Sequence, residues 1–249
     1  MNSNNTIRIK VLGISGSPRK KGNTEFLLQH ALDAAKAVNP IGVETELYSF
    51  AEKTFLPCTS CYRCQKLGYC VLEDKDDFDD LRDKWKEADA VVMATPVYHM
   101  GISGQLKCFI DRLGNSVDSP YKTYQKWFKV YGAIAQGAHI FSGQEHALSE
   151  IINHALIMGC IVVSGDAWEA YIGGGGWTEG IGKKNALKKR YEQGSSDAEA
   201  AVNASKSVGK RVAELTLILR AGVLAHTNYI EKDPAFELLL ERVRNNETV

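Results

Sequence analysis

The chain's fold class is first indicated by the segment Ile7-Arg8-Ile9-Lys10-Val11-Leu12-Gly13-Ile14, which is followed directly by Ser15-Gly16-Ser17-Pro18. It begins with alternating apolar and polar residues, becomes apolar and ends abruptly in small residues, which is typical of a buried strand and its loop. Residues 24–38 then carry an apolar stripe at helical spacing. The chain therefore opens with a strand–loop–helix unit.

Strands and helices continue to alternate beyond this unit. The patterns predict strands at 43–50, 90–94, 127–135 and 160–164, and helices at 76–87, 103–113, 144–158 and 197–220. Such alternation implies right-handed crossovers and a mostly parallel sheet. Five strands fit an α/β, flavodoxin-like doubly wound sheet of order 2-1-3-4-5 with helices on both faces.

The domain organisation predicted from these patterns is simple. Residues 1–220 form one domain that contains a cysteine loop at 58–70, and residues 221–249 form a C-terminal helical extension with a short helix at 236–240. The segment 173–196 opens with four glycines and shows no clear periodicity, so it is expected to be a mobile insertion or lid.

Composition excludes several classes of protein. The 249 residues have a formal net charge of zero and interspersed acidic and basic residues, which argues against a nucleic-acid or anionic-membrane surface as the main function. The polar residues 1–6 lack the apolar core of a signal peptide. No apolar run approaches the roughly 20 residues that span a bilayer. A cytoplasmic protein is predicted.

Four of the six cysteines lie close together as Cys58-x2-Cys61-x2-Cys64-x5-Cys70. A loop that returns a thiol every third residue can fold around one compact inorganic centre, and in a reducing cytosol clustered thiols are more often ligands or redox groups than disulfides. A [4Fe–4S] cluster held by four thiolates is the main interpretation. Structural zinc, which usually uses two Cys-x2-Cys pairs with a longer spacer, is an alternative, and so are thiols that bind nothing.

The two remaining cysteines have a different setting. Cys108 and Cys160 both lie among apolar residues. They are predicted to be small buried hydrophobic residues rather than ligands.

The loop at residues 13–24 reads Gly-Ile-Ser-Gly-Ser-Pro-Arg-Lys-Lys-Gly-Asn-Thr and opens onto a helix N-terminus. Its spacing fits neither the Rossmann G-x-G-x-x-G nor the P-loop motif. Hydroxyls, amides and basic side chains at a helix N-terminus suit a terminal phosphate, although an ordinary turn has the same composition. The loop resembles G-x-S-x-[SP]-R-x-x-[GS]-[NS]-[ST] of the flavodoxin-like, NADPH-dependent FMN reductase family. The resemblance implies FMN, bound here by Ser15, Ser17, Arg19, Asn23 and Thr24.

Two further loops fall at the same predicted sheet edge. Residues 95–104 resemble the family's [TS]-P-[VI]-Y-x-x-x-x-[ST]-G segment, which implies flavin contacts from Pro96, Val97, Tyr98 and His99. His99 is equally compatible with a solvated surface group, and Ser103 is a candidate helix cap. After the fourth strand, backbone groups of Gln136 and Gly137 are expected near the pyrimidine end of the ring, where amide donors stabilise the reduced flavin. Residues 142–145, Ser-Gly-Gln-Glu, are similar to the family's G-G-Q-E step.

The cysteine loop resembles that of one branch of this family, the iron–sulfur flavoproteins, which carry C-x2-C-x2-C-x(4–7)-C after the second strand. Residues 70–78 also resemble that branch's C-x-x-x-D-D-[FM] continuation. The resemblance spans residues from about 7 to 215. It implies a [4Fe–4S] cluster on Cys58, Cys61, Cys64 and Cys70, although some relatives keep a partial set of cysteines and only FMN.

The predicted function is that of an FMN-dependent flavoprotein oxidoreductase or electron-transfer protein. A cluster would relay electrons from a one-electron donor such as ferredoxin to the flavin, which would reduce a quinone, a flavin or an oxygen species. The flavin and the cluster would carry the chemistry, so no catalytic side chain is predicted. The resemblance also implies a homo-oligomer, a dimer or tetramer. The alternatives are an NAD(P)H-dependent FMN or quinone reductase without a cluster, and a metal or redox sensor.

Overall fold

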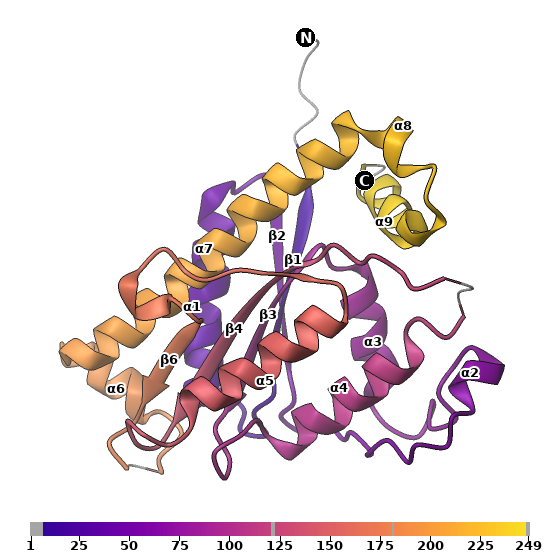
Figure 1. The fold of residues 1–249 in the computed structure, drawn as a ribbon. Coiled ribbons are helices and arrows are strands. Elements are labelled where there is room, and N and C mark those ends of the chain that lie inside the picture. The colour runs from indigo at the N-terminus through magenta and orange to yellow at the C-terminus, as the bar shows by residue number, and fades with distance from the viewer. Residues whose placement is uncertain (1–6, 121–122, 181, 248–249) are drawn as a thin grey trace.

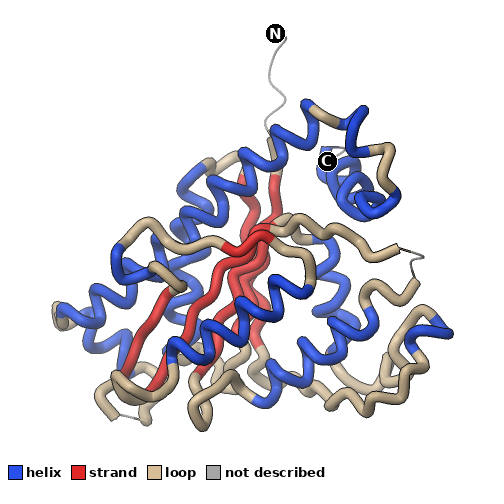
Figure 2. Tube along the Cα trace, in the orientation of Figure 1, coloured by secondary structure: helices blue, strands red, loops and turns tan. Residues whose placement is uncertain are grey.

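The structure, a computed structural model, describes residues 7–120, 123–180 and 182–247. Residues 1–6, in which the sequence shows no apolar core of a signal peptide, lie outside the described residues. One parallel sheet of order β2-β1-β3-β4-β5 forms its centre, and a sixth strand, β6, pairs with β4 beyond the end of β5 (Figures 1 and 2). The predicted doubly wound order is confirmed. The strands are β1 (Ile9–Ser15), β2 (Val43–Ser49), β3 (Ala90–Pro96), β4 (Val130–Gly137), β5 (Ile161–Val162) and β6 (Gly174–Trp177).

Helices cover both faces of the sheet, and each face has its own core. Helices α1, α6 and α7 pack on one face, and α3, α4 and α5 pack on the other. The helices are α1 (Asn23–Val38), α2 (Cys64–Leu67), α3 (Phe78–Glu87), α4 (Gly104–Ser116), α5 (Gln144–Ile157), α6 (Ala186–Glu192), α7 (Ser196–Ala225), α8 (Thr227–Ile230) and α9 (Glu237–Glu247), with 3₁₀ turns at Trp168–Ala170 and Pro234–Phe236.

The expectation of an irregular lid at 173–196 is wrong for nearly half of that segment. Residues 174–177 form β6, and residues 186–192 form α6. A Cβ at Gly174 would lie 3.0 Å from Ser205 Oγ of α7, and one at Gly176 would lie 3.0 Å from Leu27 of α1. The glycines therefore let the strand pass closely between two helices. Because glycines carry no side chains, this strand leaves no hydrophobic pattern in the sequence.

The fourth strand begins at Val130 rather than at Trp127 as predicted. Phe128 has a φ of 49°, which interrupts the extended backbone. Lys129, directly before the strand, is fully buried and lies 4.8 Å from the centre of the Trp85 ring. The side chains of Trp127 and Lys129 thus belong to the core around the base of the strand.

The C-terminal helices lie at the opposite end of the sheet from the carboxyl ends of the strands (Figure 1). Three consecutive leucines of α9, at residues 238–240, are buried inside the chain. Asp89, at the start of β3, accepts hydrogen bonds from Arg220 of α7 and Arg242 of α9. The extension therefore caps the base of the sheet and stays clear of its ligand-binding edge.

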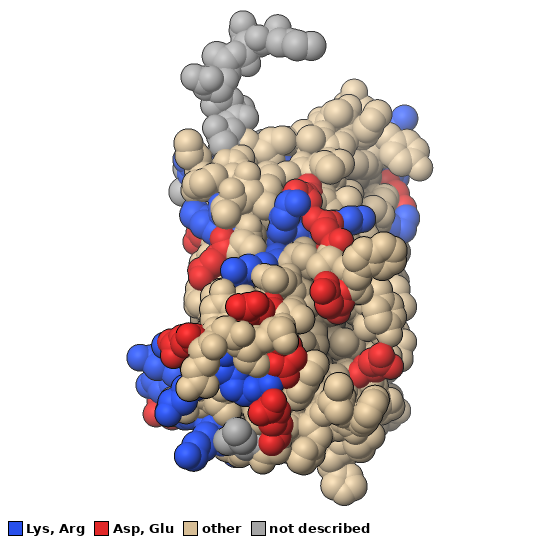
Figure 3. Space-filling model, turned by 90° about the vertical axis from the view of Figure 1, so that its left-hand side faces the viewer, with Lys and Arg blue, Asp and Glu red and all other residues tan. Residues whose placement is uncertain are grey.

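Acidic and basic side chains lie close together on the surface. Figure 3 shows Lys and Arg interleaved with Asp and Glu over one face, in agreement with the net charge of zero. The pairs that the structure contains include Lys210 and Arg211 with Asp166.

Candidate functional site: a flavin edge and a cysteine pocket

The loops after β1, β3 and β4 meet at one edge of the sheet, as parallel strands require. The amide of Gly16 donates to Ala94 O of β3 at 2.8 Å, and the amide of Val97 donates to Gln136 O of β4 at 2.8 Å. Ser103 links the first two loops, because its hydroxyl donates to Gly16 O at 2.6 Å. All three predicted flavin loops are thus hydrogen-bonded to one another.

The first loop carries polar side chains that are buried, and one of them lacks a hydrogen-bond partner among the described residues. Ser15 and Thr24 are buried, and the hydroxyl oxygen of Ser15 has no hydrogen-bond partner among the described residues. Ser17 is buried as well, and its hydroxyl accepts from the amide of Arg19 at 3.2 Å. Gly22, the N-cap of α1, offers no side-chain cap, so the positive end of the helix dipole faces the loop. An unsatisfied buried hydroxyl at an uncapped helix N-terminus fits the phosphate of FMN.

Two of the predicted FMN residues also hold a distant segment. Arg19 donates to Gly182 O at 2.9 Å, and Asn23 donates to Lys183 O at 3.1 Å. Asn23 also accepts from the amide of Leu187 at 3.1 Å. These contacts span about 160 residues of sequence, and no local pattern signals them. The segment before α6 therefore closes over the phosphate loop.

The second loop is a tight turn. Tyr98 and Gly101 exchange backbone hydrogen bonds of 2.9 and 3.1 Å, and His99 and Met100 between them both have positive φ values. The Tyr98 ring is 41% exposed, so one face is free for a planar ligand. The predicted cap is confirmed, because Ser103 Oγ accepts from the amide of Leu106. The turn presents an aromatic ring at the sheet edge on a rigid backbone.

Glu150 is a supporting residue that the sequence patterns did not reveal. Its carboxylate accepts from the amide of Ile102 at 2.8 Å and lies 2.9 Å from where a Cβ at Gly101 would stand. It belongs to α5, almost 50 residues away along the chain. A glycine at position 101 therefore leaves room for the Glu150 carboxylate to accept the hydrogen bond from the turn.

The third loop is packed tightly against the second. A Cβ at Gly137 would lie 2.0 Å from Ser142 Oγ, and one at Gly143, whose φ is 101°, would lie 2.4 Å from Met100 O. The side-chain Nε2 of Gln144 donates to His139 O at 2.6 Å and to Gly176 O of β6 at 3.3 Å. The backbone at the predicted pyrimidine end is thus fixed before any ligand arrives.

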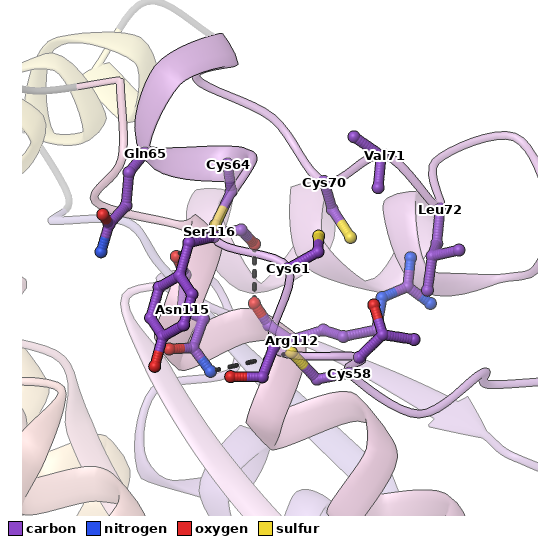
Figure 4. A pocket seen from close by; sticks show the side chains of 13 residues that line it. Cys58, Cys61, Cys64, Gln65, Cys70, Val71, Leu72, Arg112, Asn115 and Ser116 are labelled. Carbon is purple, nitrogen blue, oxygen red and sulfur yellow. Dashed lines mark hydrogen bonds between the residues drawn. The ribbon is translucent and has the colours of Figure 1, made fainter.

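The cysteine loop connects β2 to α3 and packs against the C-terminal end of α4. Cys58, Cys61, Cys64 and Cys70 all line one pocket, and all four are free thiols (Figure 4). Ser60 and Tyr62, which flank Cys61, have φ values of 52° and 54°. Such left-handed residues reverse the backbone locally, so that thiols on either side of them can turn toward one space.

Asp76 anchors both ends of the cysteine loop to α4. One carboxylate oxygen accepts from the amide of Leu56, before the first cysteine, at 2.6 Å, and from Arg112 of α4. The other oxygen accepts from the amide of Phe78 at 3.3 Å. The side chains of Asp76 and Arg112 are both fully buried. The acidic pair that follows the cysteines in the sequence thus has a structural role.

The thiols have unlike surroundings. The backbone amide of Arg63 lowers the pKa of Cys61, which is exposed, whereas burial raises the pKa of Cys64. Cys64 donates to Asn115 O at 3.0 Å, and the Asn115 amide nitrogen lies 4.0 Å from Cys58 Sγ. Across the described ranges, no three or more His, Cys, Asp or Glu side chains are arranged to hold a single metal ion.

The donor set of the pocket fits an iron–sulfur cluster. A [4Fe–4S] cluster takes one thiolate on each iron, so its four ligands ring a larger centre and do not converge on one ion. The four cysteines line their pocket together with apolar and amide groups, Val71, Leu72 and Asn115 among them. Soft thiolates in a partly apolar pocket are the ligands that such clusters use.

Of the other two cysteines, Cys160 is buried as predicted, whereas Cys108 is only partly buried. Cys160 belongs to the core beneath α4 and α5, and Cys108 packs against the same core. Burial raises the pKa of both thiols, that of Cys160 to about 11. Both thiols are therefore protonated near neutral pH, and Cys160 is also shielded by the core.

This sheet edge and its three loops define a flavodoxin-like α/β protein. Solved structures agree: a flavodoxin, WrbA-like protein from Agrobacterium tumefaciens superposes with a TM-score of 0.53 at 18% identity, over 84% of this chain and 97% of that one. An azoreductase from Bacillus anthracis superposes with a TM-score of 0.56 at 15% identity, over 82% and 99%. At these identities the likeness establishes the fold.

Sequence comparison gives the family. A sequence model of the NADPH-dependent FMN reductases matches residues 9–171. An iron–sulfur flavoprotein of Methanocaldococcus jannaschii is 37% identical over 85% of this chain and 100% of its own length, and one of Methanosarcina thermophila is 36% identical over 68% and 83%. The chain belongs to the NADPH-dependent FMN reductase family. It is thus a flavin-dependent oxidoreductase that uses FMN.

No helix in the described ranges has the length and apolar character needed to cross a membrane.

Proposed function

We propose that this flavoprotein exchanges single electrons through a [4Fe–4S] cluster held by Cys58, Cys61, Cys64 and Cys70. The observation that carries the proposal is the pocket that these four free thiols line together at the C-terminal end of α4. Relatives that are 36–37% identical are named iron–sulfur flavoproteins. A cluster accepts one electron at a time and FMN accepts one or two, so together they couple a one-electron donor to a two-electron acceptor.

The chain's own residues bind and position the flavin in this proposal. Ser15, Ser17 and Thr24 hold the phosphate at the N-terminus of α1, while Arg19 and Asn23 close the segment before α6 over it. The exposed Tyr98 ring and the turn from Pro96 through Val97 to His99 line the isoalloxazine. Backbone groups of Gln136 and Gly137 lie at its pyrimidine end. Each of these contacts orients the ring or excludes water from it.

Partners and assembly follow from the same proposal. The donor is a reduced ferredoxin or NAD(P)H, and the acceptor is a quinone, a free flavin or an oxygen species. A homo-oligomer would cover Phe141 and Trp168, which are 89% and 96% exposed. Six free cysteines suit a reducing compartment, and we infer the cytoplasm.

The decisive experiment is anaerobic purification of the wild type and of Cys61→Ser, followed by assays of flavin, iron and sulfide in the same sample. We expect about one FMN and about four irons per chain in the wild type. Cys61→Ser should keep the flavin and lose most of the iron, because the exposed Cys61 is not part of the fold's core. The matched control is Ser60→Ala, which changes a residue of the same loop. Cys160→Ser would not serve as a control, because Cys160 is buried. Wild-type protein with flavin and without iron would overturn the proposal, and zinc in place of iron would favour a metal sensor.

A second candidate is an NAD(P)H-dependent FMN reductase whose thiols bind nothing. The family model's description and the exposure of Cys61 and Tyr98 favour it. Rapid anaerobic bleaching of the flavin by NADPH in iron-free protein would support this candidate. Reduction by ferredoxin and not by NADPH would contradict it.

A further inference from the structure

Arg112 is a buried cation at the inner side of the cysteine pocket. It projects from α4, lines the pocket together with the four cysteines, and is 1% exposed. In Figure 4 its guanidinium extends past Cys58 toward the side of Cys70 and Leu72. A buried guanidinium must be paired and hydrogen-bonded, because its removal from water is otherwise strongly unfavourable.

The protein satisfies this guanidinium only in part. Nη1 donates to Asp76, and the guanidinium carbon lies 4.0 Å from the centre of the Phe78 ring. Nε and Nη2, both buried, have no hydrogen-bond partner among the residues that the structure describes. Asp76 already accepts from the amides of Leu56 and Phe78. Two guanidinium nitrogens thus remain without an acceptor among the described residues, in a pocket that the four cysteines also line.

These free donors match the chemistry of a cluster. The sulfide and thiolate sulfurs of an iron–sulfur cluster carry negative charge and accept N–H hydrogen bonds, which are among the features that set its reduction potential. Arginine remains protonated and presents its donors in a rigid plane. When one electron enters the cluster, the cluster gains one negative charge, and no proton needs to move to or from Arg112.

We propose that Arg112 is a positioning residue of the cysteine site, whose Nε and Nη2 donate to sulfur atoms of the cluster and favour its reduced state. The inference rests on the proposed function, because it requires a cluster in the pocket. Asp76 holds the guanidinium in place, and the Phe78 ring covers its outer face. The same residue therefore anchors the loop through one nitrogen and acts on the cluster through two others.

The test uses two substitutions and a matched control. Arg112→Lys keeps the charge and can still pair with Asp76, but it loses both free donors. Arg112→Met loses the charge as well. The control is Arg82→Met: Arg82 also lies over Phe78, at 5.9 Å, but pairs with Glu73 and Asp79 and does not line the pocket. Anaerobic redox titration of the full-length protein, followed by electron paramagnetic resonance of the reduced cluster, gives the potential of the cluster apart from that of the flavin.

We expect Arg112→Met to shift the one-electron equilibrium toward the oxidised cluster at least about tenfold, which is about 59 mV for a one-electron couple. Arg112→Lys should retain its iron, and the potential of its cluster should shift in the same direction by a smaller amount. Arg82→Met should leave the potential of the cluster unchanged. Equal potentials in the wild type and Arg112→Lys would overturn the inference. So would loss of iron from folded Arg112→Lys, because the residue would then serve only to hold the loop. Wild-type protein without iron would instead overturn the proposed function itself.

Discussion

The phosphate loop lies at the carboxyl ends of the strands and the cysteine pocket lies at the C-terminal end of α4, and the two are built in different ways. The phosphate loop is hydrogen-bonded to β3 and α4 and sits on α1, with Ser15, Ser17 and Thr24 buried. The cysteine loop is attached mainly through Asp76 and Arg112, and Cys61 is exposed. Folding orders the phosphate loop and leaves the Ser15 hydroxyl without a partner among the described residues, whereas the cysteine loop keeps four free thiols and two unpaired nitrogens of Arg112.

The largest effect should come from removing the anchor of the cysteine loop. Asp76→Ala would leave the buried Arg112 without its counter-charge and the amide of Leu56 without an acceptor. Breaking a buried ion pair in this way costs about 3–5 kcal/mol. Urea unfolding followed by circular dichroism should show this loss of stability, and iron should fall to near zero in protein that still binds FMN.

The control for this substitution is Asp83→Ala on α3. Asp83 pairs with Arg82 at 2.9 Å, but its side chain is 56% exposed, so we expect a change below about 1 kcal/mol. If Asp76→Ala lost FMN as readily as iron, the phosphate loop and the cysteine loop would depend on the same anchor. That result would contradict the view that the two loops are held in place separately.

The contrast also explains what the sequence could predict. Buried strands leave continuous apolar runs, and the loops that follow them leave glycines and hydroxyls, so the strands and the loops at their carboxyl ends could be predicted from local patterns. The cap of α4 by Ser103 was equally local. These features depend on residues a few positions apart.

Contacts between distant segments left no such pattern. Asp76 and Arg112 are 36 residues apart, and Asn23 meets Leu187 across 164 residues. Strand β6 was missed because three of its four residues are glycines, which show no hydrophobic alternation. The sequence therefore revealed which residue types were present at each site, but not which of them were already engaged by the protein.

A second test displaces the helix behind the phosphate loop. Gly209 of α7 lies against α1, where an added Cβ would come within 1.9 Å of Ala31 O. Because that atom is backbone, Gly209→Ala should reduce the free energy of unfolding by about 3 kcal/mol, the upper part of the range for overpacking. It should weaken FMN binding and leave iron binding on the opposite face unchanged.

The control is the same substitution in the same helix. A Cβ at Gly222 would meet nothing within 4 Å, so Gly222→Ala should stabilise the protein by about 0.5–1 kcal/mol through its better helix propensity. Thermal melts of both variants measure the two effects. Iron loss in Gly209→Ala equal to its loss of FMN would show that both loops depend on α1.

A third test uses pH to change the stability of the fold through a buried histidine of α5. Burial lowers the pKa of His154, in α5, to about 4. In the unfolded chain its pKa is about 6.5, so between these values the unfolded state binds more protons. Stability should therefore fall as the pH falls, by about 2 kcal/mol from pH 7 to pH 5. His154→Phe, which cannot titrate, should lose this part of the pH dependence in urea unfolding; an unchanged pH profile would contradict the assignment.

The smallest effect should be at Ser15. Its hydroxyl is buried without a partner, so Ser15→Ala removes an unsatisfied group and should leave the stability of the FMN-free protein unchanged or slightly higher. If the hydroxyl donates to the phosphate, FMN affinity should fall about tenfold, which is about 1.4 kcal/mol. Fluorescence titration of the FMN-free protein measures the affinity.

The matched control for Ser15 is Ser149→Ala in α5, whose hydroxyl already donates to Glu145 O at 2.8 Å within its own helix. We expect no change in FMN affinity there. Since Ser15 is far from the cysteine loop along the chain and does not line its pocket, iron content should also be unaffected. A loss of stability in FMN-free Ser15→Ala, with affinity preserved, would mean that the hydroxyl serves the fold and that the phosphate is held by its neighbours alone.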